Sequence, residues 1–125
     1  MKPLAVSMGD PAGIGLELAA RVWAAREGAP PFFLVGDPDA FERACARIGA
    51  ARPALRVAQS AEELAFETDA LSVLYAPLAI EETPGEPDPV NAEATIGAIA
   101  QGVAAVRAGA ASASAPRSTA LPNCA

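Results

Sequence analysis

Histidine is absent from the 125-residue sequence, which removes the commonest general base and the commonest ligand of transition metals. Two cysteines, Cys45 and Cys124, are too few to imply a disulfide framework. Cys45 falls on the apolar face of a predicted helix, so we expect it to be a buried free thiol and not a nucleophile. Any catalytic site would have to be built from other residue types.

Positive charge and long apolar runs are scarce as well. Nine Lys and Arg residues against fifteen Asp and Glu residues give a net charge of -6, which disfavours nucleic acid and anionic membrane surfaces as partners. No run approaches the ~18 consecutive apolar residues of a spanning helix, and no secretion-type cleavage site follows Met1. We therefore expect a cytoplasmic chain that binds neither nucleic acid nor a membrane.

Short apolar runs alternate with helical patterns through residues 1–109. Strands are expected at 4–8, 32–35, 54–57 and 71–75, and helices at about 16–27, 38–48 and 92–107. The second helix is expected to begin at Asp37, with a proline in its first turn. Alternating strands and helices predict an α/β fold with a mostly parallel sheet.

Two segments near the end of this pattern carry further expectations. Residues 81–90 hold three prolines among acidic residues, so we expect an exposed acidic connection in which Glu86→Ala is silent. In the helix that follows, one apolar stripe is expected to pack within the chain, the alternative being contact with another chain. The stripe consists of Ile96, Ile99, Ala100, Val103 and Val106.

The pattern fails after Gly109. Residues 110–125 contain several Ser and Pro residues, one Leu and no β-branched apolar residue, so no further strand is expected there. We expect residues 1–109 to form an incomplete α/β domain and residues 110–125 to be a disordered tail. The abrupt change predicts a shift of the reading frame near Ala111, which the nucleotide sequence beyond that point would test.

A glycine-rich turn, Gly9-Asp10-Pro11-Ala12-Gly13-Ile14-Gly15, joins the first strand to the first helix. Glycine lets a backbone approach a ligand closely, and the N-terminus of a helix favours an anion. Gly9, Asp10, Gly13 and Gly15 are therefore candidates for binding a substrate or an anion. We expect Gly13→Val or Gly15→Val to damage the fold or a ligand contact, because a tight turn would need positive φ there.

Known phosphate-binding motifs fit this turn only in part. No Lys-Ser or Lys-Thr pair follows the last glycine, as a P-loop requires. In the dinucleotide fingerprint, Asp37 would be the acidic residue, but Leu18 occupies the position of the third glycine. Two alternatives stay open: a tight turn without a ligand, and a small α/β module that binds a phosphorylated or nucleotide ligand at residues 9–15.

The string from Gly9 to Glu17 resembles the opening of the 4-hydroxythreonine-4-phosphate dehydrogenase family, whose members begin with a strand and then Gly-Asp/Glu-Pro-Ala-Gly-Ile-Gly. The end of the strand at 32–37 and the helix near Asn91 and Ile96 follow in the order of the family. The resemblance covers residues 1 to about 111. It implies the incomplete, N-terminal part of an isocitrate/isopropylmalate dehydrogenase-like fold.

The resemblance also implies an activity: NAD-dependent oxidation and decarboxylation of 4-phosphooxy-threonine in vitamin B6 biosynthesis. In the family, a homodimer supplies three histidines that hold a divalent metal. This chain has no histidine, and residues 114–119, its best match to the Thr-x-Pro-x-x-Lys segment of the family, lack the Thr and the Lys. We therefore expect no catalytic or metal-binding residue here, poor binding of NAD and metal, and no activity of the chain alone. A non-catalytic subunit is the third alternative.

Overall fold

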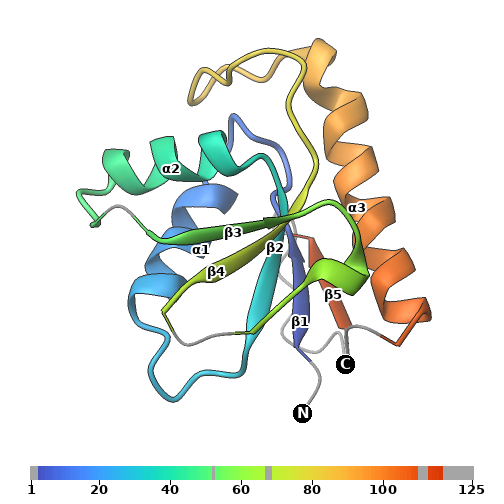
Figure 1. Cartoon of the computed structure of the whole chain (residues 1–125). Helices are drawn as coiled ribbons and strands as arrows, with labels where there is room; N and C mark the ends of the chain where they lie inside the picture. The colour runs from blue at the N-terminus through green and yellow to red at the C-terminus, as the bar shows by residue number, and fades with distance from the viewer. Residues whose placement is uncertain (1–2, 52, 67–68, 110–112, 117–125) are drawn as a thin grey trace.

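The computed structural model describes residues 3–51, 53–66, 69–109 and 113–116 (Figure 1). Five strands form one sheet in the order β3-β4-β2-β1-β5, and every pair of neighbouring strands is parallel. The α/β class and the parallel sheet predicted from the sequence are therefore confirmed. The strands are β1 (Leu4–Ser7), β2 (Phe32–Gly36), β3 (Leu55–Ala58), β4 (Leu71–Tyr75) and β5 (Ala113–Pro116).

Two central strands carry the core. Every residue of β2 is buried, as are the first four residues of β4, which is typical of a parallel strand covered on both faces. The register places Leu34 beside Val73 and Val6 beside Leu34, so apolar side chains stack across three neighbouring strands. The outer strand β3 is largely exposed.

Helices cover both faces of the sheet. α1 (Gly15–Ala24) and α2 (Pro38–Arg47) pack against each other on one face, and α3 (Ala92–Arg107) crosses the other face over β1, β2 and β5 (Figure 1). Two short 3₁₀ turns, η1 (Ala61–Glu63) and η2 (Pro89–Asn91), complete the elements. Among the described residues, no helix has both the length and the apolar character needed to cross a membrane.

The start of α2 is set by local chemistry, as the sequence predicts. The carboxylate of Asp37 accepts hydrogen bonds from the backbone N–H groups of Asp39 (2.9 Å) and Ala40 (3.2 Å), which satisfies two donors that the helix itself leaves unpaired. Cys45 on the inner face of α2 is a buried free thiol, as expected. Its burial, and secondly the charge of Glu42, raise the pKa of the Cys45 thiol, so the thiolate is disfavoured.

The inner face of α3 differs from the prediction. The helix is buried at Ala98, Gly102 and Ala105, whereas Ile96 is 67% exposed and Val103 is 38% exposed. Small residues at spacings of four and three let the helix backbone lie close to the sheet. The expected packing of the stripe is therefore wrong for Ile96, Ala100 and Val103, which are exposed, whereas Val106 is half-buried and packs against the core.

A strand also follows Gly109, where none was expected. Residues 113–116 form β5, which pairs with β1 in the register Leu4↔113 to Ser7↔116. The open hydrogen-bonding edge of β1 selects this strand, because a backbone ladder can form without favourable side chains. The prediction of a tail without a strand is wrong for these four residues. The rest of the predicted disordered tail, 110–112 and 117–125, lies outside the described residues.

Candidate functional site

Three segments meet beyond the carboxyl ends of the parallel strands: the glycine-rich turn at residues 9–15, the connection at residues 77–88, and the start of α3 (Figure 1). After β1 the chain crosses to β2 on one side, whereas β5 flanks β1 on the other side. Ligands of open α/β sheets bind at such a topological switch point. The turn predicted as a binding site therefore occupies the position where the fold favours one.

The glycine-rich turn has an internal hydrogen-bond structure. The carboxylate of Asp10 accepts from the N–H of Ala12 (2.9 Å), and the Asp10 carbonyl accepts from the N–H of Gly13 (3.0 Å). In this turn only Gly9 has a positive φ, +66°. The expectation of positive φ at Gly13 and Gly15 is wrong, and a Cβ at Gly13 would lie 3.4 Å from the Asp10 carbonyl oxygen, an ordinary contact.

The structure brings the four candidate residues together but exposes only two of them. Asp10 and Gly13 are exposed, while Gly9 and Gly15 are buried. Ile14 is the N-cap of α1, and within the described part of the chain its side chain makes no capping hydrogen bond. The N-terminus of a helix carries partial positive charge that favours an anion.

A hollow of about 360 Å³ lies between the turn and the start of α3. Its lining includes two carboxylates, Asp10 and Asp88, together with Thr95, whose hydroxyl donates to the Gly9 carbonyl (3.2 Å). The acidic side of this hollow suits an ammonium or hydroxyl group, whereas the N-terminus of α1 suits an anion. The two environments adjoin at the glycine-rich turn.

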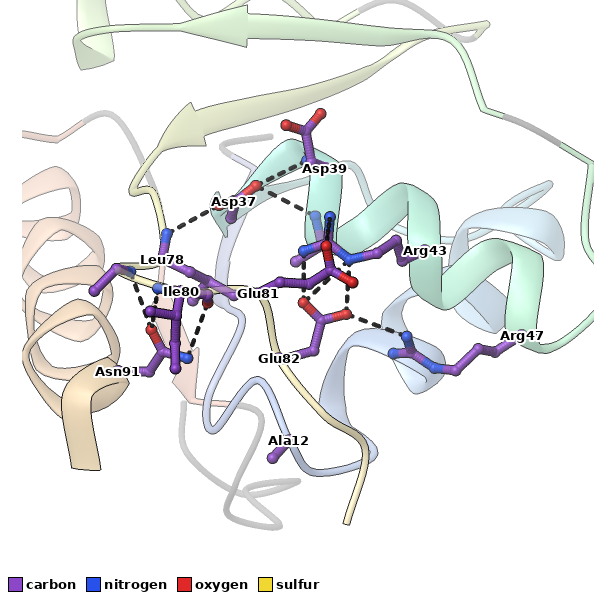
Figure 2. A network of polar contacts seen from close by, with 12 residues as sticks. Ala12, Asp37, Asp39, Arg43, Arg47, Leu78, Ile80, Glu81, Glu82 and Asn91 are labelled. Carbon is purple, nitrogen blue, oxygen red and sulfur yellow. Dashed lines mark hydrogen bonds and ion pairs between the residues drawn. The ribbon is translucent and has the colours of Figure 1, made fainter. Parts of the chain in front are cut away.

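Asp37 and Asn91, which flank this region, are engaged by backbone groups. The second carboxylate oxygen of Asp37 accepts from the N–H of Leu78 (2.9 Å). The amide of Asn91 accepts from the N–H groups of Ala79 and Ile80 and donates to the Ile80 carbonyl (Figure 2). Asp37 therefore does not fit the ribose-binding role of the dinucleotide fingerprint, since both of its oxygens already serve backbone amides.

The connection at 77–88 corrects a second expectation. Glu82 is not a solvated charge, because its side chain is only 1% exposed. Its carboxylate accepts from Arg43 Nη2 at 2.6 Å, from Arg43 Nε, and from Arg47 Nη1 at 3.2 Å (Figure 2). Arg47 Nε also donates to Glu17 in the first turn of α1 (2.9 Å). These four residues, Glu82, Arg43, Arg47 and Glu17, are called the Glu82 cluster below.

Opposing effects act on the ionisation of Glu82. Burial raises the pKa of Glu82. It is outweighed by the hydrogen bond from Arg43, a backbone hydrogen bond, the charge of Arg43 and the hydrogen bond from Arg47. The pKa of Glu82 therefore lies below its ordinary value. The pKa of Arg43 is raised, chiefly by its hydrogen bond to Glu82.

This shift predicts a pH dependence of stability. A carboxyl group whose pKa is lower in the folded state stabilises the fold above its ordinary pKa of 4.5, and this contribution disappears as the pH falls through the lower folded-state value. We expect the stability difference between the natural chain and Glu82→Gln to be largest near neutral pH and to shrink in acid. Urea unfolding at several pH values measures it, with Glu86→Gln as the control; an unchanged difference would contradict the assignment.

One buried polar atom near the turn was not anticipated. Ser7 ends β1, two residues before Gly9, and its hydroxyl is buried without a hydrogen-bond partner among the described residues. An unsatisfied buried hydroxyl costs about 1–3 kcal/mol, so a water molecule is a natural partner. Nothing in the local sequence distinguishes Ser7 from an ordinary strand serine.

A larger hollow, about 550 Å³, lies at the opposite, amino-terminal end of the sheet, where Trp23, Phe32 and Phe66 contribute to its lining. It contains none of the predicted site residues. Sites of open parallel sheets lie beyond the carboxyl ends of the strands. The glycine-rich turn is therefore the better candidate despite its smaller hollow.

The described residues do not fit a metal centre of the kind implied by the family resemblance. Within 3–51, 53–66, 69–109 and 113–116, no three Cys, Asp or Glu side chains converge as a possible metal site, and the chain has no histidine. A catalytic metal needs several protein ligands at once.

The fold and the turn define a parallel α/β protein with a glycine-rich turn at the carboxyl edge of its sheet, a class that contains many nucleotide- and phosphate-dependent enzymes. No family model matches the chain. Over 90% of its length, however, the chain is homologous to curated 4-hydroxythreonine-4-phosphate dehydrogenases, so the family resemblance is confirmed. The protein of that name from Methylorubrum populi is 42% identical over 118 residues, and that from Zymomonas mobilis is 36% identical over 115 residues.

Solved structures agree with this relationship. The crystal structure of 4-hydroxythreonine-4-phosphate dehydrogenase from Klebsiella pneumoniae is 31% identical and matches with a TM-score of 0.78, covering 93% of this chain and 37% of that one. The Burkholderia phymatum structure, at 22% identity and a TM-score of 0.81, covers 93% of this chain and 36% of its own, and shows the same fold. The dehydrogenase-like α/β fold is therefore confirmed. The chain spans 33% of the length of the curated relatives named above.

Proposed function

We propose that this chain is the part of a 4-hydroxythreonine-4-phosphate dehydrogenase fold that holds a small phosphorylated substrate at the glycine-rich turn. The observation that carries the proposal is the position of the turn, at the switch point of the sheet, with the N-terminus of α1 beside it. The phosphate would lie at the exposed Gly13, next to the N-terminus of α1, and the ammonium or hydroxyl end would face Asp10 in the hollow. A phosphorylated hydroxy-amino acid has both kinds of group.

Titration of the chain with O-phosphoserine and with inorganic phosphate, followed by NMR, tests this proposal. We expect shifts at Gly13 and Gly15 with both ligands and tighter binding of O-phosphoserine. Gly13→Val should abolish the shifts, because a branched side chain blocks close approach to the backbone. Ala104→Val on the exposed side of α3 is the matched control. Shifts that avoid the turn, or that survive Gly13→Val, would refute the proposal.

The complete reaction is proposed for a longer protein that contains this fold: NAD-dependent oxidation and decarboxylation of 4-phosphooxy-threonine in vitamin B6 biosynthesis. NAD and a divalent metal are the cofactors proposed for that longer protein, and the cytoplasm is its proposed location. The Glu, Asp and Cys residues described here do not form a metal site, and Asp37 is occupied. The substrate-holding turn is therefore the contribution assigned to this chain.

We accordingly predict that the purified 125-residue chain gives no NAD reduction with 4-phosphooxy-threonine at any added zinc, magnesium or manganese concentration. The reason is that a metal able to polarise the hydroxyl must be held by several ligands, whereas the hollow offers two carboxylates, Asp10 and Asp88, and Glu17 is engaged by Arg47. The Zymomonas mobilis relative serves as the positive control. Turnover that a chelator abolishes would overturn this prediction.

A second candidate function is favoured by the outward position of the α3 stripe. Ile96 and Val103 are exposed, and exposed apolar residues on one helix face are typical of contacts between chains. We propose a second copy of this chain as the partner, in line with the homodimer implied by the family resemblance. Light scattering should then show a dimer that Ile96→Asp converts to a monomer, with Ala104→Asp as the control. A natural chain that is monomeric at all concentrations would exclude this function.

A further inference from the structure

Two backbone carbonyls of the glycine-rich turn are hydrogen-bonded by residues distant in the sequence. The hydroxyl of Thr95 in α3 has two acceptors for its one proton, the Gly9 carbonyl (3.2 Å) and the Asn91 carbonyl (3.3 Å), and the N–H of Gly85 in the connection donates to the Ala12 carbonyl (2.8 Å). The shape of the turn therefore depends on where α3 and the connection are held.

The connection is in turn anchored by Glu82, three residues before Gly85. The Glu82 carboxylate lies between the guanidinium groups of Arg43 and Arg47 (Figure 2), with the closest contact at 2.6 Å, and its side chain is 1% exposed. Glu81, its neighbour, is 3.9 Å from Arg43 and largely exposed. Glu82 is thus the buried charge that attaches the connection to α2.

A second route joins Glu82 to the turn through α1. Arg47 donates to Glu82 through Nη1 and to Glu17 through Nε. Glu17 lies in the first turn of α1, two residues after Gly15. The same arginine therefore links the connection to the helix that the glycine-rich turn opens.

We infer that Glu82 is a positioning residue for the glycine-rich turn, which it holds through Gly85 on one side and through Arg47 and Glu17 on the other. It touches no ligand in this arrangement. Its effect on binding is indirect, because a turn that is already held in one shape loses less conformational freedom when a ligand binds. The binding part of this inference rests on the proposed function, whereas the effect on the shape of the turn does not.

A purely stabilising role is the competing explanation, and it makes a different prediction for amide exchange. Removal of a residue that only stabilises the fold speeds amide hydrogen exchange throughout the sheet. Removal of a positioning residue also speeds amide exchange locally, at the turn. The exchange rates of the Gly85 and Gly13 amides report on the turn, because each amide donates a hydrogen bond to a backbone carbonyl of the turn. Val73→Ala in buried β4 provides a variant destabilised far from the turn.

The experiment compares hydrogen exchange of the natural chain with Glu82→Gln, Glu86→Gln and Val73→Ala. We expect Glu82→Gln to speed exchange at Gly85 and Gly13 by about tenfold more than Val73→Ala does, and Glu86→Gln to change neither. Equal effects of Glu82→Gln and Val73→Ala at these two amides would overturn the inference. If Glu82→Gln does not fold, Arg47→Gln, which leaves the contact between Arg43 and Glu82 in place, is used with the same expected pattern.

A phosphate titration of the same variants gives the second measurement. Glu82→Gln should weaken binding of inorganic phosphate by about fivefold under conditions where the chain is fully folded, while Glu86→Gln binds as the natural chain does. Unchanged affinity would overturn the positioning role. If the natural chain binds no phosphate, the proposed function fails, and the exchange measurement still decides whether Glu82 positions the turn.

Discussion

Arg43→Met is expected to lower the free energy of unfolding by about 3 kcal/mol, because it removes the main partner of a buried carboxylate. The Glu82 side chain is 1% exposed and would keep Arg47 as its one remaining guanidinium partner among the described residues. Urea denaturation followed by the fluorescence of Trp23, the only tryptophan in the chain, gives the measurement.

Two further variants make this prediction specific. Arg21→Met, on the exposed side of α1, should change stability by no more than about 0.5 kcal/mol. Adding Glu82→Gln to Arg43→Met should cost less than Glu82→Gln costs alone, because the charge that lacked its partner is gone. The Glu82 cluster would contribute little if the stability losses of the two single variants simply added in the double variant. It would also contribute little if Arg43→Met lost no more stability than the control Arg21→Met.

Gly36→Ala should lower stability by about 1–3 kcal/mol, although it adds only one methyl group. A Cβ at Gly36 would lie 2.9 Å from Met8 Cβ and 3.0 Å from its sulfur. The sulfur can move, but the Cβ cannot, because the Met8 N–H is fixed to the Val35 carbonyl at 2.9 Å. Since Met8 directly precedes Gly9, the NMR signals of the glycine-rich turn should shift as well.

Gly97→Ala is the matched substitution with the opposite expected sign. Gly97 lies within α3, and apart from its chain neighbours and the backbone of its own helix no atom of the described residues stands within 4 Å of the position its Cβ would take. Alanine is favoured over glycine in a helix by up to about 1 kcal/mol, so this variant should be more stable. Chemical denaturation compares the two alanine variants directly. Equal effects at both positions would mean that the contact with Met8 is unimportant.

The elements that the sequence predicts well are those with local causes. β2 is an unbroken apolar run between a Pro-Pro pair and a helix cap, and α2 follows from Asp37, Pro38 and apolar residues at helical spacing. Such patterns act within a few residues of the chain, so they are readable without tertiary structure. The glycine-rich turn at residues 9–15 is recognisable for the same reason.

The orientation of α3 could not be read in this way. The helix is rich in Ala, Gly, Ile and Val on all sides, so periodicity offers more than one apolar face. Proximity to the sheet decides between them, because Ala98, Gly102 and Ala105 allow a closer approach than Ile96 and Val103 would. β5 is a similar case, since its pairing with β1 joins segments more than 100 residues apart and has no local sequence signal.

The α/β class, the place of the turn and the resemblance to the dehydrogenase family are readable in the sequence, because these depend on patterns between near neighbours. Tertiary structure alone decided that Glu82 is buried and Glu86 exposed, although both are glutamates of one proline-rich connection. Arg43 precedes Glu82 by 39 residues, and the two meet only because β4 runs beside β2 in a parallel sheet. A contact between segments far apart in the chain leaves no periodic signal in the sequence. The burial of Glu82 against Arg43 could therefore not be predicted from the sequence.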